Sequence, residues 1–265
     1  MTASRVGHAA DGFSSAFRVR FDEADPDGLV RSSTLLRYTQ DLAAQHSEAL
    51  GYDRAWYAAQ GLSWLVRTAE VEVREAIPYG SALLATTRVV GFRRVWSRRE
   101  TTFELDGTCV AVVRIDWVLL DRRGAPARIP AEFERIFPPR GSAGPLQLGR
   151  VALSETPADA VRVPLAVRPQ ELDPLDHVNN AAYADWLDET ILRAVGAERR
   201  ATVGAVPRRV RLEYALPAGP GETVEMLAWL EAGGWSCRVV RMGDGAELLR
   251  ARLEFGPTGS GSDPL

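Results

Sequence analysis

Lysine is missing from this 265-residue sequence, in which all 32 basic residues are arginine. The absence excludes Schiff-base chemistry and the lysine of a phosphate-binding P-loop, because both need an ε-amino group. The net charge of −3 also argues against a partner such as nucleic acid or an anionic membrane. The arginine bias is most simply explained by a GC-rich genome.

Cysteine is scarce as well: Cys109 and Cys237 lie far apart and fall in strand patterns, so we interpret both as core thiols. Their spacing predicts no disulfide framework and no metal site. No apolar run reaches the roughly 18 residues of a membrane span, and residues 1–14 lack the apolar segment of a signal peptide. We therefore expect a cytoplasmic protein without metal or other cofactor.

What the sequence does contain is a long internal repeat. Residues 23–41 (EADPDGLVRSSTLLRYTQD) align without gaps with residues 171–189 (ELDPLDHVNNAAYADWLDE), at an offset of 148 that brings Asp25 onto Asp173. Further on, an apolar–Pro pair at 77–78 matches another at 216–217, at an offset of 139. A period near 140 residues is too long for a solenoid and predicts a duplicated domain.

Both copies show the same predicted order of elements: a short strand, an Asp-Pro turn, one amphipathic helix and then only strands. We expect Ser32 or Ser33 to cap the first helix, Gly51 to end it, and Asn179 or Asn180 to cap the second. The expected strands are 17–21, 65–75, 82–91, 95–105 and 109–120, then 161–167, 209–215, 222–231, 234–242 and 247–255.

One helix followed by an antiparallel meander, present twice, predicts an α+β fold. In each half the helix would be wrapped by an antiparallel sheet, and the two sheets could pair edge to edge. The expected organisation is a disordered N-terminus, a first domain, a linker, a second domain and a disordered tail, at residues 1–14, 15–140, 141–160, 161–256 and 257–265.

The second copy carries the pattern Asp-x-x-x-His-Val-Asn-Asn-x-x-Tyr-x-x-Trp, from Asp173 through His177, Asn179 and Asn180 to Trp186. This pattern resembles the signature of hotdog-fold thioesterases. The duplication, together with RFDEADPDGLVRSSTLLRYTQDLA and LSWLVRTAEVEV in the first copy, resembles the acyl-ACP (acyl carrier protein) thioesterases of plants and bacteria. The resemblance covers most of residues 15–255 and implies a tandem hotdog fold.

Three positions depart from the plant enzymes of that family. Leu175 stands where they carry an asparagine between the aspartate and the histidine, and Pro217 and Ala218 stand where they carry a Glu-Cys pair. A cysteine nucleophile or a glutamate base at that place is therefore unsupported here. The resemblance carries over Asp173 and His177 as catalytic residues.

The chemistry implied is attack on a thioester carbonyl. Backbone N–H groups near Asn180 and Ala181, at the start of a helix, could stabilise the oxyanion. Asp173 could act as a nucleophile that forms a mixed anhydride or as a base that orients water, and the sequence leaves both routes open. His177 could transfer a proton or hold Asp173 or the thioester by a hydrogen bond. An Asp-Pro turn and helix caps are the structural alternatives for Asp173, Asn179 and Asn180.

Other candidates are weaker. Asp25 matches the aspartate of single-hotdog acyl-CoA thioesterases, but its copy has Leu29 in place of the histidine, so binding or a turn is favoured over catalysis. Trp64 could line an acyl channel under the first helix, and His46 falls on that helix. A basic patch for acidic ACP could come from arginines that we otherwise interpret as a solvated strand face: Arg93, Arg94, Arg98 and Arg99.

The favoured function is hydrolysis of acyl-ACP to a free fatty or other carboxylic acid, with acyl carrier protein as partner. Asn179, Asn180 and Trp64 would bind the substrate. An acyl-CoA thioesterase and a non-catalytic acyl-thioester-binding protein are the alternatives. The sequence does not set the oligomeric state and leaves a homodimer open.

Overall fold

The computed structural model describes residues 12–137, 149–196, 201–231 and 233–256. Its strands form one ten-stranded antiparallel sheet in the order β1-β3-β4-β5-β2-β7-β10-β9-β8-β6. The first half of the sheet contains β1 (Phe13–Arg18), β2 (Leu62–Val73), β3 (Ala82–Arg93), β4 (Trp96–Leu105) and β5 (Thr108–Asp121). The second half contains β6 (Val161–Ala166), β7 (Arg208–Tyr214), β8 (Thr223–Glu231), β9 (Gly234–Arg241) and β10 (Glu247–Phe255).

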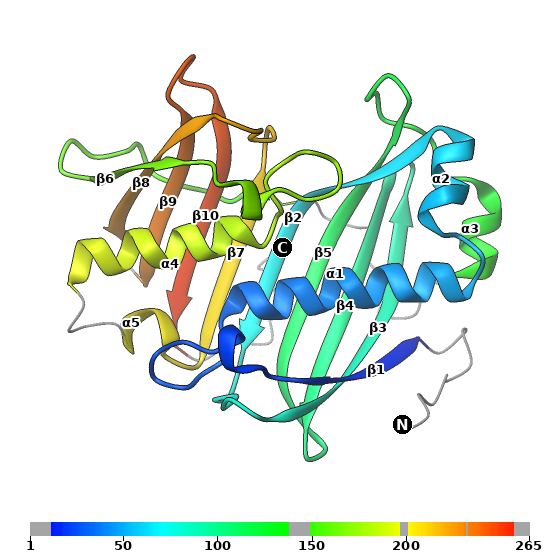
Figure 1. Cartoon of the computed structure of the whole chain (residues 1–265), viewed down its shortest axis with the longest axis horizontal. Coiled ribbons are helices and arrows are strands. Elements are labelled where there is room, and N and C mark those ends of the chain that lie inside the picture. Colours follow the sequence, from blue (N-terminus) through cyan, green and yellow to red (C-terminus); the bar gives the residue numbers. More distant parts are fainter. Residues whose placement is uncertain (1–11, 138–148, 197–200, 232, 257–265) are drawn as a thin grey trace, which may run out of the picture.

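Two long helices lie across the same face of the sheet (Figure 1): α1 (Ser32–Ala49) over the first half and α4 (Ala182–Val195) over the second. The helix layer is completed by short pieces, namely the 3₁₀ turns η1 (Phe21–Glu23) and η2 (Pro169–Glu171) and the helices α2 (Arg54–Gln60), α3 (Ala131–Ile136) and α5 (Ala201–Gly204). Within the described ranges, no helix is both long and apolar enough to span a membrane.

The helices bury the faces that their sequence periodicity predicts. In α1 the apolar residues at helical spacing are buried against the sheet, among them Leu35, Leu36 and Leu42. In α4 the side chains of Trp186 and Leu187 are likewise inaccessible to solvent. The first helix ends at Ala49, and Gly51 lies at the predicted position just after the C-cap, where its positive φ of 85° favours glycine.

Several local predictions are wrong. Neither serine caps α1: the helix already begins at Ser32, whose hydroxyl instead accepts a hydrogen bond from Arg208 Nε at 3.2 Å. The Ser33 hydroxyl is buried without a partner among the described residues. The first strand lies earlier than predicted, because residues 21–23 form a 3₁₀ turn. The helices α2, α3 and α5 were not predicted, since each spans too few residues to show a helical period.

The two halves are related by an approximate two-fold axis. In the sheet, Val71 of β2 pairs directly with Val210 of β7, and these residues correspond at the repeat offset of 139. In the helix layer, Arg37 of α1 forms a 2.6 Å ion pair with Asp185 of α4, and these correspond at the offset of 148. Each contact therefore joins one position to its own counterpart, in agreement with both sequence offsets, and confirms the duplicated fold.

The halves differ in length. Strands β2 to β5 have 10 to 14 residues, whereas β7 to β10 have 7 to 9. Strand β2 pairs with β7 only over residues 68–73, so residues 62–67 extend beyond the second half. Helix α1 is also longer, at 18 residues against 14 for α4. The extended end of the first half is covered by α2 and α3 (Figure 1).

The domain boundaries remain predictions, because residues 1–11, 138–148 and 257–265 lie outside the described ranges. Residues 149–160, in the second part of the predicted linker, contain no helix or strand. This segment packs against the sheet: Val151 N–H donates to Glu213 Oε2 at 2.9 Å, and Ser154 N–H to Glu231 Oε1 at 3.2 Å.

Candidate active site

The Asp173 turn follows η2 and precedes α4. Asp173 N–H donates to the carbonyl of His177, and Leu175 N–H donates to Asp173 Oδ1, both at 2.8 Å. These bonds fix the carboxylate in a tight turn, with Asp176 in the left-handed region at φ 61°. The second carboxylate oxygen, Oδ2, has no hydrogen-bond partner among the described residues, so one oxygen orients the group while the other is available for chemistry.

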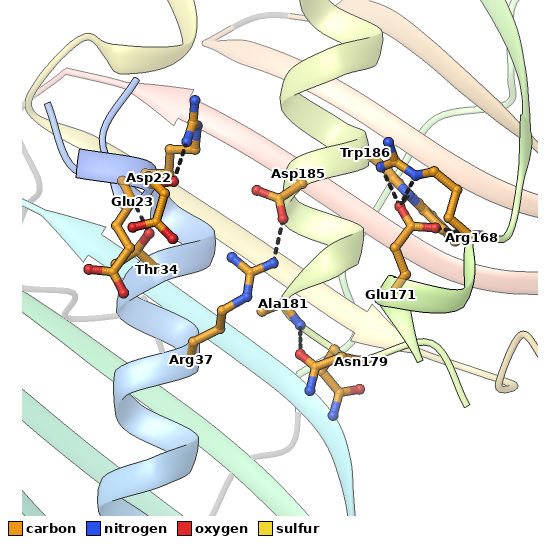
Figure 2. Close-up of polar contacts among 12 residues, drawn as sticks. Asp22, Glu23, Thr34, Arg37, Arg168, Glu171, Asn179, Ala181, Asp185 and Trp186 are labelled. Atoms are coloured by element: carbon orange, nitrogen blue, oxygen red, sulfur yellow. Dashed lines mark hydrogen bonds and ion pairs between the residues drawn. The ribbon is translucent and has the colours of Figure 1, made fainter. Parts of the chain in front are cut away.

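The N-cap position of α4 is Ala181, without a side-chain cap, so the predicted cap by Asn179 or Asn180 is wrong; Asn179 lies in the turn just before the helix and connects it to the first half. Its Oδ1 accepts from Ala181 N–H at 2.9 Å (Figure 2), and its Nδ2 donates to Gln40 Oε1 of α1 at 3.5 Å. The Ala181 N–H is thereby occupied, which corrects our expectation that it would serve the oxyanion. Within the described structure, the Asn180 N–H has no partner and is the donor that remains. The Asn180 carbonyl accepts from Tyr214 Oη at 2.9 Å.

A cavity of about 580 Å³ lies between α1 and the sheet of the first half. Asp173, Pro174 and Asn179 line it from the second half, so the two halves build it together. Arg54 of α2 donates to the Pro174 carbonyl at 3.0 Å and holds the turn against the rim. The remaining wall is largely aromatic and apolar, with Tyr52, Tyr57, Trp64, Val89, Phe92, Trp117, Phe133 and Phe137.

The cavity contains two of the four candidate residues of the Asp173 turn, together with Trp64. Asp173, Asn179 and Trp64 line it, whereas His177 and Asn180 are not among its lining residues. His177 lies half-buried at the far end of the turn, and its side chain has no hydrogen bond to the described residues. The structure therefore places Asp173 and Asn179 at the mouth of an apolar cavity, whereas His177 does not line it.

A buried arginine lies in the cavity wall. Arg99 of β4 is only 8% exposed and donates from Nη1 to His46 Nδ1 of α1 at 2.9 Å. Burial lowers the pKa of its guanidinium to about 10, so it stays protonated at neutral pH. This overturns both sequence interpretations of Arg99, as a surface patch and as a solvated strand face. Its neighbour Arg98 is bound to Asp116 by two hydrogen bonds of 2.6 and 2.8 Å on the opposite face of β4.

The sequence signal for Arg99 is the alternation of β4. Ser97, Arg99, Thr101 and Phe103 are buried, whereas the residues between them are partly exposed. Read with a period of two from Phe103, the strand directs Arg99 inward. An arginine at an inward position is rare, so the residue type argues for solvent and masks the strand period.

The matched turn at Asp25 has different surroundings. Its Oδ1 accepts from the N–H groups of Asp27 and Leu29, each at 2.9 Å, as a turn requires. It lines a depression of about 1060 Å³ together with Asp188 and Arg208 and many other charged residues. Burial raises the pKa of Asp188 to about 7, with Arg208 opposing the shift. No apolar cavity lies beside this turn in the described structure.

Other candidates are structural. Burial raises the pKa of both the Cys109 and the Cys237 thiols, which makes each a poor nucleophile. Ala218 is fully buried and donates its backbone N–H to Tyr183 Oη at 3.2 Å. In the described ranges no three His, Cys, Asp or Glu side chains are grouped so as to hold a metal ion.

Family models match nearly the whole chain. Residues 10–137 match the acyl-ACP thioesterase N-terminal domain, and residues 154–257 match the acyl-ACP thioesterase C-terminal domain. The chain belongs to the acyl-ACP thioesterase family. Its relatives in that family include the chloroplastic acyl-acyl-carrier-protein hydrolase FATB2 of Cuphea viscosissima, 24% identical over 94% of this chain. The chloroplastic dodecanoyl-acyl-carrier-protein hydrolase of Umbellularia californica is also 24% identical, over 92%.

The chain spans 64% of the length of the Cuphea protein and 68% of that of the Umbellularia protein. Solved structures share the fold. The 12:0-ACP thioesterase from Umbellularia californica superposes with a TM-score of 0.77 at 21% identity, covering 91% of this chain and 96% of that one. An acyl-ACP thioesterase from Bacteroides thetaiotaomicron gives 0.77 at 16% identity, covering 92% and 97%. The predicted tandem hotdog fold is thus confirmed.

Proposed function

We propose that this protein hydrolyses acyl-ACP thioesters to free carboxylic acids, with Asp173 as the catalytic carboxylate. One observation carries the proposal: a carboxylate with a free oxygen lies at the mouth of an apolar cavity of about 580 Å³. The acyl chain would occupy the cavity, and phosphopantetheine would approach over the Asp173 turn. The cytoplasm is the proposed compartment, acyl carrier protein the proposed partner and a homodimer the proposed assembly.

In the reaction, an oxygen nucleophile adds to the thioester carbonyl and the C–S bond then breaks. With Asp173 as base, the attacking oxygen is that of water, whose proton passes to Oδ2 and finally to the leaving thiolate. With Asp173 as nucleophile, an acyl-aspartyl anhydride forms first, and water hydrolyses it in a second step. In either route the carbonyl oxygen becomes negative, and the Asn180 N–H is the donor available to stabilise it.

His177 has a supporting role in this proposal. Its place at the end of the turn, outside the cavity lining, suits a relay that passes the proton on to the leaving sulfur better than it suits contact with the acyl chain. Asn179 holds the turn to α1 through Gln40, so it positions Asp173 and does not act on the thioester itself.

The test is a hydrolysis panel that compares acyl-ACPs with acyl-CoAs across short to long chains. We expect turnover of acyl-ACP with a higher kcat/KM than that of the matched acyl-CoA. A higher kcat/KM on acyl-CoA would assign the CoA donor instead. Stoichiometric binding of acyl-ACP without release of acid would establish a non-catalytic binding protein and end the enzymatic proposal.

A further inference from the structure

The inner part of the cavity is polar, in contrast to its aromatic walls. Arg99 presents a guanidinium there, bound to His46 Nδ1 at 2.9 Å and to Ser47 Oγ at 3.5 Å, with Phe137 5.3 Å away from its charged carbon. A guanidinium has five N–H donors, and these two bonds use two of them. Tyr57 adds a phenol that interacts electrostatically with Arg99. The group is therefore equipped to donate further hydrogen bonds into the cavity.

No carboxylate in the described structure pairs with Arg99. The acidic residues that line the cavity are Glu48, which is exposed, and Asp173 at the mouth, and neither forms an ion pair with it. A buried cation is unfavourable unless an anion or several hydrogen bonds compensate it. The other buried guanidinium, Arg208, donates four hydrogen bonds to backbone carbonyls and Ser32. Arg99 is the less satisfied of the two.

Arg99 is not required by the hotdog fold itself. Counting outward through the strand pairs from the central β2–β7 contact, Thr101 of β4 occupies the place of Trp235 in β9. The residue of the second half that corresponds to Arg99 is then Gly233, which precedes the first residue of β9. The arginine therefore belongs to the strand extension that the second half lacks and that forms the cavity.

The distance from the mouth can be estimated along α1. Asn179 contacts Gln40, and Arg99 contacts Ser47, seven residues further along the same helix. At 1.5 Å per residue this separation is about 10 Å. An extended chain advances roughly 1.25 Å per C–C bond of about 1.5 Å. Arg99 is thus within reach of about the eighth carbon of an acyl group whose carbonyl lies at Asp173.

We propose that the cavity selects acyl groups that carry an oxygen acceptor, most favourably a carboxylate, near the eighth carbon, and that Arg99 recognises this oxygen. The inference rests on the proposed thioesterase function and specifies its substrate class. An oxygen at that position takes up the unused N–H donors, whereas a methyl-terminated chain leaves them unpaired inside an apolar wall. The competing role for Arg99 is purely structural, fastening the end of α1 to β4 through His46.

The experiment compares octanoyl, 8-hydroxyoctanoyl and octanedioyl thioesters on the same carrier, with the full-length protein. We expect kcat/KM to rise on the order of 10- to 100-fold from the methyl-terminated to the carboxylate-terminated chain. Arg99→Met should abolish or invert that order. Arg98→Met is the matched control, since it removes the neighbouring arginine from the opposite face and should leave the order unchanged. Equal or better hydrolysis of octanoyl thioester by the wild-type protein would overturn the proposal.

A binding measurement separates this inference from the proposed function. Octanedioic and octanoic acid are titrated against wild type and Arg99→Met, with the fluorescence of the cavity tryptophans as signal. Selective binding of octanedioic acid that depends on Arg99, without hydrolysis of any thioester, would uphold the recognition and reject the enzyme. Hydrolysis of methyl-terminated acyl thioesters, with no effect of the Arg99→Met substitution on hydrolysis or on binding, would support the enzyme and reject the recognition by Arg99. Should Arg99→Met not fold, the wild-type order of the three thioesters still decides the matter.

Discussion

The two Asp-Pro turns have nearly the same backbone and opposite surroundings. In each, the aspartate N–H donates at 2.8 Å to the carbonyl four residues later, and Oδ1 accepts from the residue two positions on. Yet Asp173 faces an aromatic cavity, and Asp25 faces Asp188 and Arg208. The hydrogen bonds of the turns therefore do not distinguish Asp173, the residue that we propose as catalytic, from its counterpart Asp25, whereas the surroundings of the two residues do.

The difference arises from the half opposite each turn. The Asp173 turn lies over α1, where the longer strands and the helices α2 and α3 leave a cavity. The Asp25 turn lies beside α4, under which the short second half is filled by Trp186, Leu187 and Ile191. The longer first half thus leaves a cavity beside the turn of the second half. A duplicated fold can acquire one site by this route without any change in either turn.

The largest expected effect tests the contrast between the turns. Asp173→Asn keeps the Oδ1 acceptor but removes the charge, so the rate should fall on the order of 10²–10⁴-fold. Asp25→Asn should keep nearly full activity. Melting temperatures should change little and alike in both variants, because each amide can still accept the turn hydrogen bonds. Near-full activity of Asp173→Asn would contradict the assignment, and a dead Asp25→Asn would place the reaction in the other half.

The next prediction tests the similarity of the halves at the axis. Val71→Ala and Val210→Ala each remove two methyl groups from a site without solvent exposure, so each should lower the free energy of unfolding by about 1.5–3 kcal/mol. Because the two valines face each other across the axis, the losses should agree within about 0.5 kcal/mol. Urea unfolding followed by circular dichroism measures both. A gap of more than about 1 kcal/mol would show that the symmetry does not extend to packing.

A smaller effect concerns the charge of Asp188, whose matched residue in α1 is the neutral Gln40. An unfolded aspartate has a pKa near 3.9, and burial raises that of Asp188 to about 7. Between these values the folded state binds more protons, so this residue makes stability fall as pH rises from about 4 to 7. Asp188→Asn should therefore raise the melting temperature by roughly 2–4 °C at pH 8 and by little at pH 4. An equal change in melting temperature at pH 4 and pH 8 would contradict the raised pKa of Asp188.

The smallest expected effect concerns the thiols. Cys109→Ala and Cys237→Ala should each leave turnover nearly intact, because the pKa of both thiols is raised by burial and neither lines the cavity. Alkylation kinetics with and without each substitution provide the check. Inactivation that one substitution abolishes would identify a nucleophile in place of Asp173.

The long helices and strands could be predicted from sequence because the residues that they bury are apolar and recur at the period of the element. Strand alternation and the repeat located all ten strands, nine of them to within a few residues, and the buried faces of α1 and α4. The N-terminal cap of α1 could not be predicted in this way, because the Ser32 hydroxyl accepts a hydrogen bond from Arg208, which is more than 170 positions away in sequence. Arg99 was misassigned for a related reason: a charged residue in a strand argues for solvent unless the cavity is already known.

One apolar core runs through both halves, with Val71, Ile115 and Leu36 from the first and Val210, Leu212 and Leu187 from the second in the same cluster. The sheet is continuous across it at β2 and β7. Neither half can therefore unfold without exposing apolar surface of the other, so gene duplication here produced one cooperative folding unit in place of two. Heating should give a single calorimetric transition, and a fragment containing one half alone should behave as a folding intermediate rather than as a domain.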